Sequence, residues 1–282
     1  MQPVTEVAFT PRSPYDLRLS IGPPDAARRF RGGVLELVYP LAAGHAFARV
    51  WQRHDGQLSA RIDADAATEA HDRLAELLGV GIDHGPFLRL AAADTLLQPL
   101  RSRLRGLRPI ALASPAQALI RAVCGQLIRS SEALRIERRI MREHGRPQDG
   151  LMLPPTGAQL AATHPARFER AGLSPARAVV LQRAARRLRL ERLADDPVDI
   201  AQRRICREPG LGPWSAGVLM VYGLGRHERG LTGDLALVRL GEQLGVDQGT
   251  LLDRYGEWQG MASVWLMHHP LAAARVRPGA TG

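Results

Sequence analysis

The sequence predicts an α+β protein in which an antiparallel sheet with packed helices precedes a longer, mostly helical region. Short runs of alternating apolar and polar residues occur in the first part, whereas apolar residues recur at helical spacing from about residue 86 onward. The chain has 282 residues, of which 45% are hydrophobic, so it is long enough to bury a sizeable core. We therefore expect an α+β domain at 1–85 and a helical region at 86–282.

The first domain is expected to contain a meander of three or four strands. The strand-like runs are DLRLSI (16–21), GGVLELVY (32–39), HAFARVWQ (45–52) and QLSARI (57–62). Asp55-Gly56 is a tight-turn signal before the last of them. The segment 65–79 then places leucines at helical spacing and ends at Gly79, which predicts a helix packed on one face of the sheet.

The second region is expected to be helical, with short connections. The helices are predicted at 86–106 with an interruption near Pro99, at 114–145, 174–193, 197–207, 213–222 and 234–244, and within 247–269. Ser114-Pro115 and Ser174-Pro175 each place a capping hydroxyl before a proline at the first helical position. Residues 149–157 are expected to form a loop and residues 270–282 a frayed basic tail.

The charge of the chain is uneven along its length. Residues 1–100 hold 10 Arg and 12 acidic residues, whereas residues 101–282 hold 28 Arg and 16 acidic residues. A basic second part favours a polyanionic partner, with nucleic acid ahead of a membrane surface. All 38 basic residues are arginine, which a GC-rich genome would produce regardless of function. The absence of lysine nevertheless removes any side-chain amine that could form a Schiff base.

Cysteine usage and the chain start limit the remaining classes. Cys124 and Cys206 are far apart and lack a CxxC spacing, so neither a zinc site nor a four-cysteine iron–sulfur cluster is expected. We expect no metal and two buried free thiols. No apolar run is long enough to span a membrane and no secretory leader is evident, so a cytoplasmic protein is expected. We also expect a monomer.

The segment EPGLGPWSAG (208–217) carries the first chemical signal. A predicted helix runs into Pro209-Gly210-Leu211-Gly212, and a new helix begins at Pro213. Glycines at such a hairpin allow a phosphate to approach backbone N–H groups at a helix N-terminus. Taken alone, the pattern is more often an ordinary turn between helices.

The spacing to a later Gly-Asp changes this interpretation. The helix after the hairpin is followed by a loop that ends at Gly233-Asp234, where another helix begins. This arrangement resembles the helix-hairpin-helix (HhH-GPD) DNA glycosylase superfamily, and most closely its 3-methyladenine DNA glycosylase II, AlkA-like branch. Further similar segments are ASPAQALIRAVCGQLIRSSEAL (113–134), AGLSPARAVVLQRAARRL (171–188), YGEWQGMASVWLMHH (255–269) and TPRSPYDLRLSI (10–21).

The resemblance implies a fold and an activity. It implies a two-lobed helical glycosylase core and a hydrolase that removes alkylated bases, such as 3-methyladenine and 7-methylguanine, from damaged duplex DNA in base excision repair. Asp234 matches the catalytic aspartate, although Gly-Asp-Leu by itself indicates only a helix N-cap. Leu127 matches the wedge that fills the gap left by a flipped nucleotide, and alone would be read as a core leucine.

Other roles follow from the same resemblance. Trp214 stands where bifunctional relatives carry a nucleophilic lysine, so the enzyme is expected to lack lyase activity. Trp214 would line the base pocket or, as an even alternative, pack the hairpin. The other expected pocket residues are Gln126, Tyr222, Trp265 and Met267, where Met267 replaces a family tryptophan and Gln259 a family arginine. The expected DNA-backbone contacts are Pro209, Gly210, Leu211, Gly212 and Ser215.

Two alternatives remain at this point. A non-catalytic helix-hairpin-helix protein would bind DNA through the same arginines and hairpin, but an acid such as Asp234 would repel the phosphates. An unrelated helical enzyme with coincidental glycines is disfavoured by the extent of the resemblance. No cofactor is expected. Whether the hairpin carbonyls bind a structural monovalent cation is not decided by the sequence.

Overall fold

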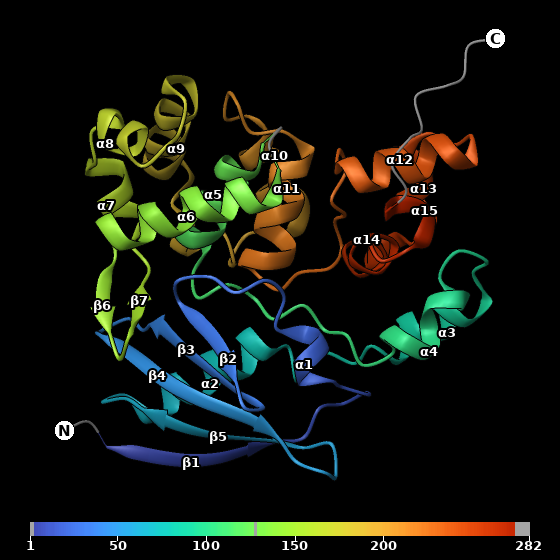
Figure 1. Ribbon diagram of the computed structural model, residues 1–282, viewed down its shortest axis with the longest axis horizontal. Helices are drawn as coiled ribbons and strands as arrows, with labels where there is room; N and C mark the ends of the chain where they lie inside the picture. Colours follow the sequence, from blue (N-terminus) through green and yellow to red (C-terminus); the bar gives the residue numbers. More distant parts are fainter. Residues whose placement is uncertain (1–2, 127–128, 274–282) are drawn as a thin grey trace.

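The computed structural model describes residues 3–126 and 129–273 (Figure 1). A five-stranded antiparallel sheet is combined with many helices, so the predicted α+β class is confirmed. Within these residues, no helix combines the length and the apolarity needed to cross a membrane.

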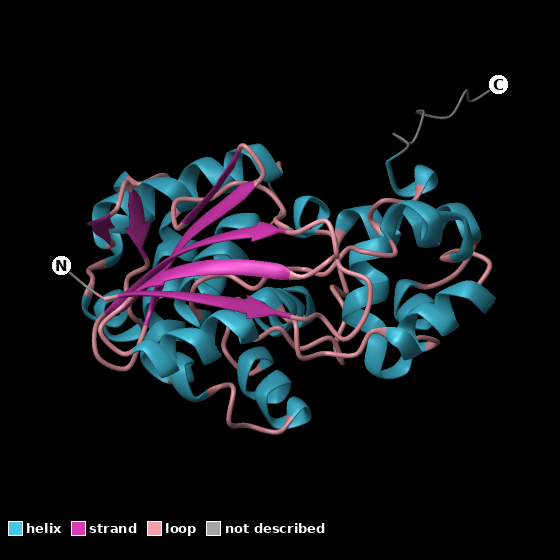
Figure 2. Cartoon of the chain, turned by 90° about the horizontal axis from the view of Figure 1, so that it is seen from below, coloured by secondary structure: helices cyan, strands magenta, loops and turns pink. Residues whose placement is uncertain are grey.

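The sheet has the strand order β1-β5-β4-β3-β2. Its strands are β1 (Val4–Phe9), β2 (Arg28–Arg31), β3 (Val34–Pro40), β4 (His45–Gln52) and β5 (Leu58–Asp63). Strands β3 to β5 form the expected meander, β2 extends it by pairing with β3, and β1 pairs with β5 at the other edge. The helix α2 (Ala67–Leu78) packs on one face, where the Tyr39 hydroxyl donates to the Ala70 carbonyl at 2.9 Å. Figure 2 shows the strands running side by side with helices behind them.

The strands differ from the prediction at several places. The run 16–21 forms a short helix, α1 (Leu17–Ser20), because the Asp16 carboxylate caps it by accepting from Leu19 N at 3.0 Å. Strands β1 and β2 were not predicted. The expected loop at 149–157 contains part of a hairpin, β6 (Arg146–Gln148) and β7 (Leu151–Leu153), which turns at Asp149 and Gly150 with positive φ.

The helical region follows the prediction more closely. Its α-helices are α3 (Gly85–Ala93), α4 (Arg101–Leu104), α5 (Pro115–Gly125), α6 (Ser130–His144), α7 (Gly157–Ala162), α8 (Pro165–Arg170), α9 (Pro175–Leu188), α10 (Val198–Cys206), α11 (Pro213–Val218), α12 (Leu235–Leu244), α13 (Gln248–Asp253), α14 (Gln259–Leu266) and α15 (Pro270–Ala273). A π-helical turn, Leu219–Gly223, extends α11. Helices α7 and α8 were not predicted.

Some details of these helices differ from the expectation. The expected helix 114–145 is two helices, because the backbone is extended at Gln126 and Arg129. The Ser114 hydroxyl caps α5 by accepting from Gln117 N at 3.1 Å, whereas Ser174 makes no side-chain cap on α9. The start of the expected tail is helical, as α15.

The helices gather in two groups (Figure 1). Helices α5 to α11 lie over the sheet, and α12 to α15 lie beside them together with α3 and α4. Phe87 of α3 meets Trp265 of α14 edge to face, with ring centroids 5.0 Å apart, and the Tyr255 hydroxyl lies 3.2 Å from Asp94 Oδ1. The segment 85–94 therefore packs against Tyr255 and α14. The predicted boundary between the two domains, after residue 85, lies at the start of α3. The division into these two domains stays a prediction.

A buried ion network ties the sheet domain to the helices. Arg121 of α5 binds Glu137 of α6 at 2.9 Å and Asp25, before β2, at 3.3 Å. Asp25 also binds Arg28 at 3.0 Å. The two carboxylate side chains are only 1% exposed, so the arginine partners must compensate each carboxylate for the hydration that it loses on folding.

Candidate active site

The hairpin between α10 and α11 has a backbone that requires glycine at one position. Gly210 has φ of +88°, and an added Cβ would lie 2.5 Å from Val180 Cγ2. Gly212 is the N-cap of α11 and its added Cβ would meet nothing within 4 Å. No side chain caps α11 in the described structure, so no capping group occupies the backbone N–H groups of its first turn.

Leu211 and Ser215 are both buried, so they support the hairpin from inside. The Leu211 N–H donates to the Glu208 carbonyl at 2.9 Å, which closes the turn. Pro209 and Gly210 are exposed. Of the expected backbone contacts, these two and Gly212 are therefore the ones that a ligand can reach directly.

The end of α5 is bound to this hairpin. The Gln126 side-chain amide donates to the Gly210 carbonyl at 2.7 Å and lies 3.4 Å from Ser215 Oγ. The Arg177 guanidinium donates to the Gln126 carbonyl. The side-chain amide of Gln126, an expected pocket residue, is thus engaged in hydrogen bonding within the protein. The expected wedge, Leu127, lies outside the described residues.

Asp234 is held at both carboxylate oxygens. It is the N-cap of α12, and its Oδ1 accepts from Ala236 N at 2.9 Å. Its Oδ2 accepts from the indole Nε1 of Trp214 at 3.2 Å. The carboxylate is partly exposed. The N-cap prediction for this residue is therefore confirmed, and the structure adds a tryptophan donor that the sequence did not indicate.

Tyr222 lies in the π-helical turn after α11 and is half-buried. Burial raises the pKa of Tyr222 to about 12, against the opposing effect of the positive charge of Arg121, and the negative charge of Asp234 raises it further. The phenol is therefore neutral at physiological pH. Tyr222 lies on the π-helical extension of α11, the helix that carries Trp214.

Trp265 and Met267 belong to the other helical group. Trp265 is fully buried against Phe87, so its ring offers no face to an extruded base and the pocket role expected for it is not supported. Met267 is partly buried at the end of α14. Cys124 is buried as expected, but Cys206 at the end of α10 is exposed, which corrects that prediction.

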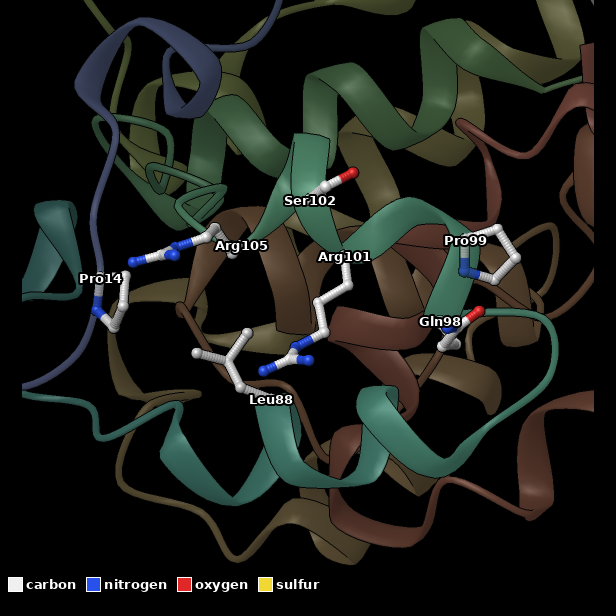
Figure 3. Close-up of a pocket in the computed structure, with 7 residues that line it drawn as sticks. All are labelled: Pro14, Leu88, Gln98, Pro99, Arg101, Ser102 and Arg105. Carbon is white, nitrogen blue, oxygen red and sulfur yellow. The ribbon is translucent and has the colours of Figure 1, made fainter.

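Pockets lie elsewhere on the surface. One pocket, of about 670 Å³, is lined by Leu88 of α3, Arg101 and Arg105 among others. Figure 3 shows its lining residues, with the Arg101 side chain beside Leu88. Another, of about 700 Å³, lies between α2 and the start of α5 and reaches Gly223. Neither is lined by Asp234 or Trp214. Among the described side chains, no group of three or more His, Cys, Asp or Glu is arranged to hold a metal ion.

Comparison with solved structures places the fold. The chain is similar to a 3-methyladenine DNA glycosylase from Archaeoglobus fulgidus, with a TM-score of 0.82 and 16% identity over 96% of this chain and 100% of the other. It is also similar to an 8-oxoguanine glycosylase/lyase from Clostridium acetobutylicum, with a TM-score of 0.75 and 16% identity over 95% and 98% of the two chains.

A third similar structure is shorter. The 3-methyladenine DNA glycosylase Mag1 of Schizosaccharomyces pombe, in complex with abasic DNA, has a TM-score of 0.52 and 18% identity over 67% of this chain and 98% of its own. No family model matches the sequence. No curated protein sequence matches it either. The structural similarity shows that this chain has the fold of these DNA glycosylases.

Proposed function

We propose that the chain is a monofunctional DNA glycosylase that removes alkylated bases, such as 3-methyladenine and 7-methylguanine, from duplex DNA in base excision repair. The observation that carries the proposal is the Asp234 carboxylate, which is held at one oxygen by the α12 backbone and at the other by Trp214 of α11, the helix that follows the hairpin. The fold, which is that of solved DNA glycosylases, supports it.

Asp234 would act on the sugar. Breaking the N-glycosidic bond leaves the electron pair on the base and positive charge on C1′, and a fixed carboxylate stabilises this oxocarbenium-like state. Water then adds to C1′ and loses a proton to the carboxylate or to solvent. An N3- or N7-alkylated purine is already cationic, so its departure needs no strong general acid. A single carboxylate is therefore sufficient.

The hairpin and the arginine-rich second region would hold the DNA. Phosphate contacts position a duplex without reading its sequence, and Gly212, where an added Cβ would meet nothing within 4 Å, leaves room for such a contact. A damaged base within a duplex must be flipped out before the sugar can be reached, and Leu127 is proposed as the wedge. We propose that the protein acts as a monomer in the cytoplasm.

The absence of lysine supports hydrolysis without strand cleavage. A glycosylase/lyase mechanism needs an amine that forms a Schiff base with the sugar, and no side chain in the sequence provides one. The proposed activity therefore differs from that of the similar Clostridium protein, which is a glycosylase/lyase.

The variant Asp234→Asn tests the proposal. Asparagine keeps the cap on α12, because it is as good an N-cap as aspartate, but removes the negative charge. With methylated duplex DNA, the wild type is expected to release 3-methyladenine or 7-methylguanine and leave sites that break only in alkali. The variant is expected to lose about 100-fold or more in single-turnover rate, the scale for removing one electrostatic group.

Binding to abasic duplex DNA is the control for this experiment and is expected to survive in the variant. A variant that excised bases at the wild-type rate would remove Asp234 from the mechanism. A wild type that bound duplex DNA but released no alkylated base would instead support a non-catalytic DNA-binding protein.

A further inference from the structure

Trp214 lies at the meeting point of three segments that are distant in sequence. It is the second residue of α11 and directly follows the hairpin, whose last residue, Gly212, caps that helix. Its indole Nε1 donates to Asp234 Oδ2 at 3.2 Å, across 20 positions of sequence. It also touches the end of α5 at Gly125. One side chain thus contacts the acid and the end of α5, and its backbone continues directly from the hairpin.

The indole occupies space that a glycine leaves free. A Cβ added at Gly125 would lie 2.6 Å from Trp214 Cη2, so the outer edge of the ring rests where only a glycine leaves room. A Cβ added at Gly233 would lie 3.5 Å from Trp214 Cβ, in ordinary contact. The ring therefore packs against the end of α5, and the Cβ of Trp214 lies near the turn that precedes α12.

The hydrogen bond from Trp214 completes the orientation of the carboxylate. The helix cap uses only Oδ1 of Asp234, on Ala236 N, which leaves rotation of the group about its last side-chain bond unspecified. The second donor, on Oδ2, comes from a different helix. With one donor on each oxygen, the plane of the carboxylate is set by α11 and α12 together.

The loop between the π-helical turn and α12 fixes the start of α12 through contacts with α11 and α14. On α11, a Cβ added at Gly217 would lie 2.2 Å from the Gly230 carbonyl oxygen, so the loop backbone packs closely there. On α14, Leu231 N donates to Ser263 Oγ at 3.0 Å and Gly260 N donates to the His227 carbonyl at 2.7 Å. These backbone contacts do not set the rotation of the Asp234 carboxylate, which the Trp214 donor sets. Gln126 separately joins the end of α5 to the Gly210 carbonyl at 2.7 Å.

From these contacts we propose that Trp214 is a positioning residue, which sets the orientation of the Asp234 carboxylate relative to the DNA-binding hairpin through its indole N–H. The proposal rests on the proposed function. It assigns the indole to the enzyme's own carboxylate, whereas a pocket residue would present the ring to the extruded base.

Two substitutions of Trp214 test the hydrogen bond. Trp214→Phe keeps an aromatic ring against Gly125 but has no donor, and Trp214→3-benzothienylalanine keeps the full shape with sulfur in place of N–H. Both are expected to lower the single-turnover excision rate about 10- to 100-fold, the effect of one lost hydrogen bond to a charged group. The Kd for abasic duplex DNA is expected to stay within about twofold, because the hairpin is unchanged.

A third variant moves the ring without removing its N–H. Gly125→Ala places a methyl group against Trp214 Cη2 and is expected to lower the excision rate with the same unchanged Kd. Matched controls are Trp51→Phe, on β4 of the sheet, and Gly81→Ala, where an added Cβ meets nothing within 4 Å. Both controls are expected to excise at the wild-type rate.

The outcomes separate this inference from the proposed function. If the benzothienyl variant keeps the wild-type rate while Asp234→Asn is inactive, the function stands and the positioning role of the N–H is refuted. If the Trp214 variants lose DNA affinity rather than rate, the ring contacts the DNA and the inference is also refuted. A wild type without excision activity refutes the proposed function, and the inference with it.

Discussion

At Gly210 the backbone conformation and the surrounding space both exclude a side chain. Its φ is +88°, and an added Cβ would lie 2.5 Å from Val180 Cγ2 on α9. Gly212, two residues later, has φ of −112° and open space around it. We expect Gly210→Ala to lower the free energy of unfolding by about 1–3 kcal/mol, and Gly212→Ala to change it by no more than about 0.5 kcal/mol.

Urea unfolding followed by circular dichroism measures both glycine variants. Equal destabilisation by the two substitutions would contradict the described hairpin conformation. The sequence indicated that the two glycines of this hairpin allow a phosphate to approach the backbone closely. It could not show that the two positions need glycine for different reasons. One glycine is required by the protein itself, and the other leaves space on the outside.

The residues of the candidate site could be predicted only in part. Asp234 was expected as a helix N-cap from the Gly-Asp pattern, and the structure confirms that cap. The bond from Trp214 to Asp234 was not expected, because it depends on the path of a loop and on the glycine at 125. The burial of Trp265 depends on α3, which is remote in sequence, so counting along α14 could not reveal it.

At the scale of elements, the hairpin carbonyls have protein donors. The Pro209 carbonyl accepts from the Arg183 guanidinium, and the Gly210 carbonyl accepts from Gln126. Because these carbonyls already accept hydrogen bonds from protein donors, a bound monovalent cation, which the sequence neither predicted nor excluded, is expected to add little stability. We expect replacement of potassium by choline at constant ionic strength to change Tm by no more than about 1 °C.

Differential scanning calorimetry in potassium and choline chloride measures this effect, with sodium chloride as a further comparison. Stabilisation that rises with potassium concentration but not with choline would show a specific site and contradict the expectation. Arg183→Met provides the matched variant, since it frees the Pro209 carbonyl while leaving Gln126 in place.

Secondary structure was predictable where periodicity and capping agreed. The helix before Gly79 satisfied both and was confirmed. The strand 45–52, predicted from its β-favouring residues, was also confirmed. The run 16–21 alternates like a strand, but the Asp16 cap and the burial of Leu17 and Ser20, three positions apart, favour a helical turn. The β6–β7 hairpin was missed because each strand has only three residues, too short for a periodic signal.

At the scale of the whole molecule, two buried histidines lie where the sheet domain meets the second helical group. His84 immediately precedes α3, and His227 lies in the loop before α12, with ring centroids 5.5 Å apart. Their exposures are 1% and 7%. Such an arrangement of chain segments more than a hundred residues apart is not visible in local sequence patterns, which is why the second helical group could not be assembled from the sequence.

Both histidines are expected to make the stability of the protein depend on pH. Burial, reinforced by the positive charge of Arg108, lowers the pKa of His84 to about 2 and that of His227 to about 4. In the unfolded chain both would titrate near the usual value of about 6.5. As pH falls below 6.5 the unfolded state therefore binds protons that the folded state does not, so stability is present above that pH and is lost toward pH 4.

The loss at pH 5 is on the order of 2 kcal/mol for each histidine. Urea unfolding at intervals between pH 7.5 and 5 measures it, and His84→Gln and His227→Gln, which cannot titrate, should each show a shallower decline than the wild type. The comparison uses slopes, so a constant cost of either substitution cancels. The exposed His54 is a matched control, because His54→Gln removes a histidine that is solvated in the folded state and should leave the slope unchanged. Equal slopes in all four proteins would contradict the neutral, buried state of the pair and place the acid sensitivity elsewhere in the molecule.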